Sequence, residues 1–208
     1  MGVVTALRAG RRGRISVFVD GVYACSVSDT LLARHRLYQG LELDDADLEA
    51  LRQQASGERV LGDAHRLLAQ RQRSREELRR RLLQKDHTEE AVATALERLA
   101  EDGLLDDRAF AEAFVADKRR FGGWGAERIR RGLVELGVSA DTAALALGEA
   151  DADAELERAL EILRRGGPPQ PPLEGARRRA YAVLQRRGFA GPVCYAAVKR
   201  WSDTSAST

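Results

Sequence analysis

Apolar residues recur along the chain with a period of 51 residues. Each copy holds two apolar positions four residues apart, as on one face of a helix: Leu78 and Leu82, Ile129 and Leu133, and Ala180 and Leu184. A short break follows each pair, namely Asp86-His87-Thr88, Gly137-Val138-Ser139 and Gly188-Phe189-Ala190. A third apolar stripe then begins at Val92, Ala143 and Cys194. A fixed period of about this size is typical of tandem structural repeats, so we expect three stacked units.

The hydrophobic pattern predicts three amphipathic helices in each copy, because apolar residues are spaced three and four apart. In the first copy these helices are expected over 58–71, from 75 to about 85, and from 89 to about 102. The fold class is therefore mainly α, with three tandem three-helix repeats that resemble helix-turn-helix modules. The predicted boundaries are 58–105, 106–150 and 151–202 for repeats 1 to 3, with a disordered tail over 203–208.

The first 57 residues have a different pattern and predict a small accessory element. Residues Ile15 to Val27 alternate in the manner of two strands, and Asp20-Gly21 between them is a strong signal for a tight hairpin turn. Because a lone hairpin is marginally stable in water, it must pack on other elements. We expect helices near 28–36, capped by Ser28, and near 45–54 to provide that surface.

Overall charge says little, since 34 basic and 32 acidic residues leave a net charge of +2. The distribution is more informative: residues 64–85 hold eight basic and two acidic residues, whereas residues 86–107 hold eight acidic and one basic. Repeat 1 thus has a positive half and a negative half. Such a surface suits a partner of mixed charge, such as a protein bound to nucleic acid, or else it is two solvated helix faces.

Nothing in the sequence predicts secretion or membrane insertion. The N-terminus lacks a long apolar region, and no stretch approaches ~18 consecutive apolar residues. Cys25 and Cys194 lie far apart in apolar surroundings, without the spacing of a metal site or of a disulfide framework. We therefore expect a cytoplasmic protein with two thiols in its core.

Three stretches together resemble the RecX family, the regulators of the RecA recombinase. They are LLAQRQRSREELRRRLLQK (67–85), GLLDDRAFAEAFV (103–115) and GWGAERIRRGLVELGVS (123–139). The resemblance covers roughly residues 60–201 and is weakest in repeat 3. Two features depart from the family pattern: Asp86 stands where a glycine is usual, and the linker GGPPQPPLE (166–174) is long.

The resemblance implies a curved, elongated array of three-helix repeats that lies in the groove of a RecA filament on single-stranded DNA. There it would inhibit the ATPase, strand exchange and filament growth of RecA, and so modulate recombination, DNA repair and the SOS response. A monomer suits this mode of binding, so we expect a monomer. Single-stranded DNA would be bound weakly, or through RecA. The resemblance implies no cofactor.

Basic residues near the start of the second helix of each repeat are the candidate contacts to that partner, or to DNA phosphates. Guanidinium groups suit both, because they pair bidentately with carboxylates and phosphates. The alternative is that they serve solubility and pairs within a helix, such as Glu77 with Arg81. The candidates are Arg71, Arg73, Arg75, Arg79, Lys118, Arg119, Arg120, Arg128, Arg131, Arg177, Arg178 and Arg186.

Trp124 is an aromatic residue in the glycine-rich segment 122–125. It could stack on a base, enter a pocket of a partner, or fill the joint between two helices, and we favour the joint. The segment lacks the Lys-Ser/Thr of a phosphate-binding P-loop and follows no predicted strand, so we interpret it as a turn.

Catalysis is not predicted. His35, His65 and His87 do not share a metal-ligand spacing, and the pair Asp106-Asp107 suits a helix cap better than a metal site. Two other function classes remain open. One is a sequence-independent nucleic-acid binder or transcription regulator that acts without RecA, and the other is a nuclease that depends on Asp106.

Overall fold

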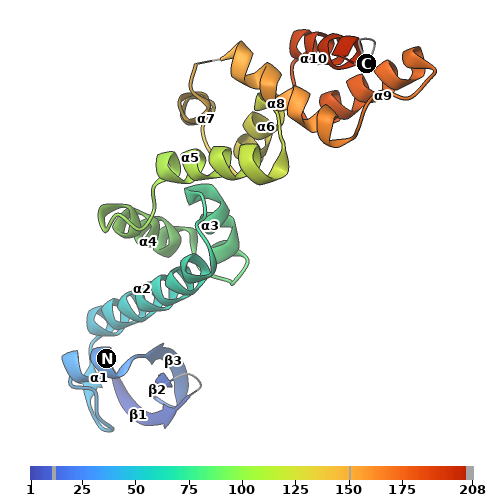
Figure 1. Ribbon diagram of the computed structural model, residues 1–208. Coiled ribbons are helices and arrows are strands. Elements are labelled where there is room, and N and C mark those ends of the chain that lie inside the picture. Colours follow the sequence, from blue (N-terminus) through green and yellow to red (C-terminus); the bar gives the residue numbers. More distant parts are fainter. Residues whose placement is uncertain (11–12, 150, 205–208) are drawn as a thin grey trace. The chain divides into compact units, whose positions relative to one another are not determined.

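The computed structural model describes residues 1–10, 13–149 and 151–204 (Figure 1). The chain forms two compact units. The first contains Met1–Arg73 and Glu77–Leu105, and the second contains Ser74–Glu76 together with the chain from Asp106 onward. Each unit is described below by itself.

The N-terminal part of the first unit is a four-stranded antiparallel sheet with the order β3-β2-β1-β4. Its strands are β1 (Gly2–Ala9), β2 (Ile15–Val19), β3 (Val22–Val27) and β4 (Glu42–Leu43). The predicted hairpin is β2–β3, and its turn residues Asp20 and Gly21 both have positive φ, 50° and 80°. The prediction was incomplete because β1, which pairs with β2, was missed. Adjacent Val3 and Val4 obscure its alternation in the sequence.

Helix α1 (Asp29–Arg34) is capped by Ser28 as predicted, and the Ser28 hydroxyl accepts a hydrogen bond from Leu31 N at 3.1 Å. Leu31 and the sheet residues Val4 and Val17 are almost fully buried and share one core with Leu51 from the next helix. The hairpin thus obtains the packing surface that it needs.

Helix α2 (Asp45–Gln70) is a single helix of 26 residues. The prediction of two separate helices, ending near 54 and beginning near 58, is therefore wrong. Ala55 packs in the core of the sheet and Val60 packs in the core of repeat 1. Because five residues turn a helix by about 500°, the buried face rotates between these two positions, and packing on both sides offsets the cost of a glycine at 57. The predicted boundary at 57–58 falls inside this helix.

Repeat 1 packs the second half of α2 with α3 (Arg75–Leu83) and α4 (Glu89–Glu101). Leu78 and Leu82 are fully buried, as their place in the repeat predicts. Asp86 has φ 59°, so it adopts the left-handed conformation that glycine adopts most readily. Aspartate tolerates this region better than most residues do.

Repeats 2 and 3 lie in the second unit, and each has its own core. Repeat 2 contains α5 (Asp107–Asp117), the π-helical turn η2 (Lys118–Gly122), α6 (Ala126–Glu135) and α7 (Ala140–Leu147). Repeat 3 contains α8 (Ala152–Arg165), α9 (Leu173–Arg186) and α10 (Gly191–Thr204). Helix α10 continues through 203–204, where a disordered tail was predicted, and residues 205–208 lie outside the described part of the chain.

The 51-residue period has a direct structural counterpart. Ile129, Leu133 and Leu184 are fully buried, and Ala180 is 5% exposed. The break after each second helix begins with a residue of positive φ, at 59°, 83° and 83° for Asp86, Gly137 and Gly188. The next residue, which is His87, Val138 or Phe189, is buried. The three copies therefore share a turn that reverses the chain and inserts one side chain into the core.

Candidate basic interface

Two of the predicted contact residues pair with Glu77 within repeat 1. Arg71 Nη1 donates to Glu77 Oε2 at 2.9 Å, and Arg73 donates to the same carboxylate. The Arg73 side chain is only 6% exposed and also donates to the Leu67 carbonyl at 3.2 Å. Burial acts to raise the pKa of Glu77, but hydrogen bonds and charges from both arginines outweigh it and hold this pKa below its ordinary value. The i, i+4 pairing of Glu77 with Arg81 that the sequence suggested is thus replaced by Glu77 with Arg73.

Arg79 also has a partner inside repeat 1, since its Nη1 donates to both carboxylate oxygens of Glu89, at 2.8 and 2.9 Å. This pair joins the positive half of the repeat to its negative half. Arg75 belongs to the short segment that groups with the second unit, where its backbone N–H donates to Asp107 Oδ1 at 2.7 Å. Its side chain is exposed. Of the first predicted cluster, Arg75 is therefore the best placed to reach a partner.

The second cluster surrounds the π-helical turn η2. Lys118 Nζ lies 5.1 Å from the ring centroid of Phe114, and Arg120 lies 5.0 Å from that of the exposed Phe121. Arg119 is half-buried and donates to the Leu147 carbonyl at 3.1 Å. Burial and the nearby charge of Arg158 lower the pKa of Arg119 from its ordinary value, while Glu155 opposes them. This turn therefore concentrates positive charge against aromatic rings.

Trp124 fills the joint between η2 and α6. The Trp124 ring meets the Phe114 ring edge-on, with 6.2 Å between the two centroids. The Arg128 guanidinium lies 4.1 Å from the centroid of the Trp124 ring. Arg128 also donates to the Arg186 carbonyl at 3.3 Å. Trp124 and Arg128 are thus half-buried packing residues.

The remaining candidates lie on the surface of the second unit. Arg131 on α6, and Arg178 and Arg186 on α9, are exposed. Arg177 is also exposed and donates through Nε to Ser202 Oγ at 3.0 Å. We therefore divide the twelve candidates into those that stabilise the repeats and those whose charge faces solvent, which are Arg75, Arg120, Arg131, Arg178 and Arg186.

A cavity of about 230 Å³ in the second unit was not predicted. Arg119, Arg120 and Trp124 contribute to its lining, together with Phe121 and Arg187. Arg158, Glu161 and Arg165 come from α8 and complete the charged part of the wall. In the sequence these α8 residues resemble ordinary surface charges at i, i+3 and i+7, so only their placement against η2 identifies them.

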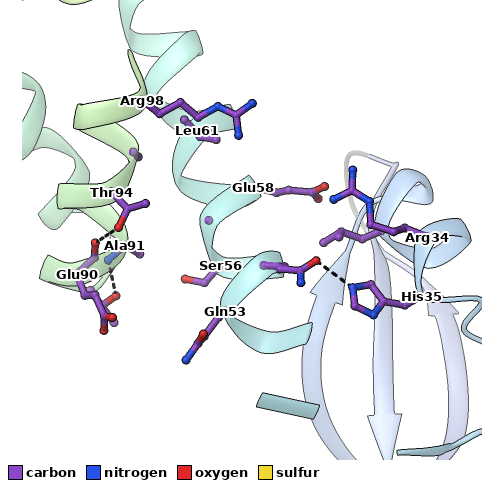
Figure 2. Close-up of a pocket in the computed structure, with 15 residues that line it drawn as sticks. Arg34, His35, Gln53, Ser56, Glu58, Leu61, Glu90, Ala91, Thr94 and Arg98 are labelled. Carbon is purple, nitrogen blue, oxygen red and sulfur yellow. Dashed lines mark hydrogen bonds between the residues drawn. The ribbon is translucent and has the colours of Figure 1, made fainter. Parts of the chain in front are cut away.

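A second cavity, of about 650 Å³, lies in the first unit between α1, α2 and α4 (Figure 2). Its wall mixes apolar residues with charges of both signs, including Arg34, Glu58 and Arg98. His35 Nε2 is hydrogen-bonded to Gln54 Oε1 at 2.9 Å along one side. The predicted basic residues do not line this cavity.

His87 is buried between charged residues in repeat 1. Its Nε2 lies 2.9 Å from Asp63 Oδ2, and its Nδ1 lies 3.4 Å from Arg59 Nη2. Burial acts to raise the pKa of Asp63, but the hydrogen bond with His87 and the charges of Arg66 and Lys85 lower it below its ordinary value. His87 lies in the break predicted after the second helix, and the structure adds its role in satisfying a buried carboxylate.

The other polar candidates have structural roles. Asp106 caps α5, and its Oδ1 accepts from Arg108 N at 2.8 Å and from Ala109 N at 3.0 Å. Cys25 and Cys194 are free and buried as predicted, and burial raises the pKa of both thiols. Within the described residues there is no group of three or more His, Cys, Asp or Glu side chains arranged to hold a metal ion. The same residues include no helix with the length and apolarity to span a bilayer.

Comparison with known proteins gives consistent matches. The model of the first three-helix domain of RecX matches residues 62–99, and the model of the second three-helix domain matches residues 106–147. "Regulatory protein RecX" of Halalkalibacterium halodurans is 33% identical over 148 residues, which are 68% of this chain and 56% of that protein. "Regulatory protein RecX" of Lactobacillus johnsonii is 30% identical over 192 residues, which are 91% of this chain and 71% of that protein.

Two solved structures share the fold. A crystal structure of regulatory protein RecX aligns with a TM-score of 0.68 and 24% identity, covering 96% of this chain and all of that one. The crystal structure of RecX from Lactobacillus salivarius aligns with a TM-score of 0.62 and 18% identity, covering 72% of this chain and 97% of that one.

Proposed function

The chain belongs to the RecX family, and from that premise we propose that it regulates the RecA recombinase by binding RecA filaments on single-stranded DNA. In this proposal it inhibits the ATPase, strand exchange and filament growth of RecA, and it acts as a cytoplasmic monomer. Its relatives in Halalkalibacterium halodurans and Lactobacillus johnsonii are named regulatory proteins. Those names do not state what is regulated, and RecA is the target that we propose.

The observation that carries the proposal is the distribution of solvent-facing guanidinium groups over successive repeats. Arg120 and Arg131 lie in repeat 2, and Arg178 and Arg186 lie in repeat 3. A filament repeats the same surface along its axis, so a chain of repeats can bind it through many modest contacts. Guanidinium groups suit both carboxylates of a protein and phosphates of the strand inside it.

In this proposal RecA hydrolyses the nucleotide, and this chain only binds. The glycine-rich segment 122–125 is used for packing: Gly125 N donates to the Arg187 carbonyl at 2.8 Å. A Cβ atom on Gly125 would lie 2.4 Å from the Gly188 carbonyl oxygen, so this close approach requires glycine. The segment thus joins repeat 2 to repeat 3, which suits a binding protein that presents a fixed surface.

A combined variant tests this distribution. Replacing Arg120, Arg131, Arg178 and Arg186 with glutamine should weaken inhibition of the RecA ATPase far more than any of the single replacements does. The control is the double variant Arg108→Gln, Glu112→Gln, which removes an exposed i, i+4 ion pair from α5. If one single replacement abolishes inhibition, the contacts are not distributed.

A further inference from the structure

The arginine-lined cavity of the second unit is preformed by backbone packing. Arg187 Nη1 donates to the carbonyls of Gly122 and Gly123 at 3.1 and 3.4 Å. A Cβ atom on Gly123, whose φ is 58°, would lie 2.6 Å from that same Nη1 atom. The backbone of Gly122 and Gly123 therefore holds the Arg187 guanidinium in place in the cavity wall.

The cavity carries more positive charge than its lining carboxylate, Glu161, and the nearby Glu155 neutralise. Glu155 pairs with Arg158 at 3.0 Å and Glu161 pairs with Arg165, which leaves three further arginines in the wall. The Nε atom of Arg158 is buried, and no other described group accepts a hydrogen bond from it. Arg119 and Arg158 are both partly withdrawn from solvent and repel each other. An oxyanion in the cavity would relieve this repulsion and accept the free donors.

An exposed aromatic ring stands beside this charge. Phe121 lines the cavity, yet it is 75% exposed, and the Arg120 guanidinium lies 5.0 Å from its ring centroid. It belongs to the π-helical turn η2, a distortion that is frequent at functional sites. Exposed rings beside basic grooves are how proteins hold single-stranded nucleic acid, because each base offers a face to stack on.

We propose that this cavity holds one backbone phosphate of single-stranded DNA while Phe121 stacks on the adjacent base. A volume of about 230 Å³ fits a phosphate, and it is smaller than the ~300–1,000 Å³ of sites that enclose whole small molecules. The base therefore lies at the rim, where Phe121 is. An acidic peptide would satisfy the arginines but would offer no base to stack on the exposed ring of Phe121. The inference rests on the proposed function in one respect: it takes the bound strand to be the single-stranded DNA of a RecA filament.

The test uses the full chain without RecA and measures fluorescence anisotropy of a labelled oligothymidylate at low salt. Phe121→Ala should weaken binding at least about fivefold, because stacking on one base contributes roughly 1–3 kcal/mol. The matched control is Tyr195→Ala, which removes an aromatic of similar exposure, 69%, from α10. Arg120→Gln should reduce the slope of log K against log salt by about 0.7, whereas Arg164→Gln, on α8 outside the cavity lining, should not.

Equal affinities for Phe121→Ala and Tyr195→Ala would overturn the proposal. The proposal would also fail if oligoglutamate displaced the oligothymidylate equally well from the wild type and from Phe121→Ala. That result would assign the cavity to an acidic peptide. Measuring inhibition of the RecA ATPase by the wild type and the same variants distinguishes failure of the cavity proposal from failure of the proposed function. If Phe121→Ala binds naked DNA normally and the wild type still inhibits RecA, the cavity proposal fails and the proposed function stands.

Discussion

Replacing Glu77 with alanine should destabilise repeat 1 more than removal of either of its arginine partners. Arg73 is 6% exposed, and without Glu77 it becomes a buried charge that keeps only hydrogen bonds to the Leu67 carbonyl, at 3.2 Å, and to Gln70, at 3.4 Å. Breaking a buried ion pair from one side costs about 3–5 kcal/mol. Because the two remaining bonds partly satisfy Arg73, we expect the lower end, about 3 kcal/mol.

Arg71→Ala is the matched control. The Arg71 side chain is 51% exposed, so solvent screens its pair with Glu77, and its loss should cost at most about 1 kcal/mol. Urea unfolding followed by far-UV circular dichroism measures both changes. A cost below 1 kcal/mol for Glu77→Ala, or equal costs for the two variants, would refute the assignment of Glu77 as the buried centre of this cluster.

The same carboxylate makes a pH prediction. The pKa of Glu77 is lower in the folded chain than its ordinary value of 4.5, so the stability it contributes is fully present above that value. As pH falls through the lowered pKa, this contribution is lost. The difference in unfolding free energy between wild type and Glu77→Gln should therefore be constant near neutral pH and shrink in the acid range below 4.5. If the difference in unfolding free energy between wild type and Glu77→Gln grew on acidification, the pKa of Glu77 could not be lowered by folding.

Three further replacements test the repeat geometry. Leu82→Ala at a fully buried position should cost about 2–5 kcal/mol, and a thermal melt shifted by less than about a degree would place Leu82 outside the core. Gly125→Ala should destabilise the second unit, because its Cβ would lie 2.4 Å from the Gly188 carbonyl oxygen; an unchanged tryptophan-fluorescence melt would contradict that contact. Asp86→Gly should stabilise the chain by up to about 1 kcal/mol, since φ is 59° there, and a loss of stability in urea would refute strain at this turn.

The repeat architecture could be predicted from the sequence because its signal is local and occurs three times. Leu78, Ile129 and Ala180 mark the same face of the second helix, and burial follows that pattern. The split of α2 was wrong because Ser56 and Gly57 resemble a helix end, whereas packing against two different cores keeps the helix continuous. Strand β1 was missed because its identity depends on pairing with residues that come later in the chain.

The candidate site was less predictable, because composition cannot distinguish an arginine that faces solvent from one that faces a carboxylate. Arg73 and Arg75 are two residues apart, yet the first is buried against Glu77 and the second is exposed. Reversing the charge of a whole sequence cluster around 71–79 would therefore damage folding as well as binding. The arginines of α8 escaped notice since their role depends on a neighbouring turn that lies about 40 residues earlier in the sequence.

The most direct test of RecA as the target is a titration of its ATPase on single-stranded DNA with this protein, beside a binding titration on the same DNA without RecA. The proposed function predicts inhibition at protein concentrations well below those that saturate naked DNA, because the filament offers many contacts at once. Inhibition that appears only when naked DNA is also saturated would mean competition for the strand. That result would contradict a regulator of the filament and favour a nucleic-acid binder that acts without RecA.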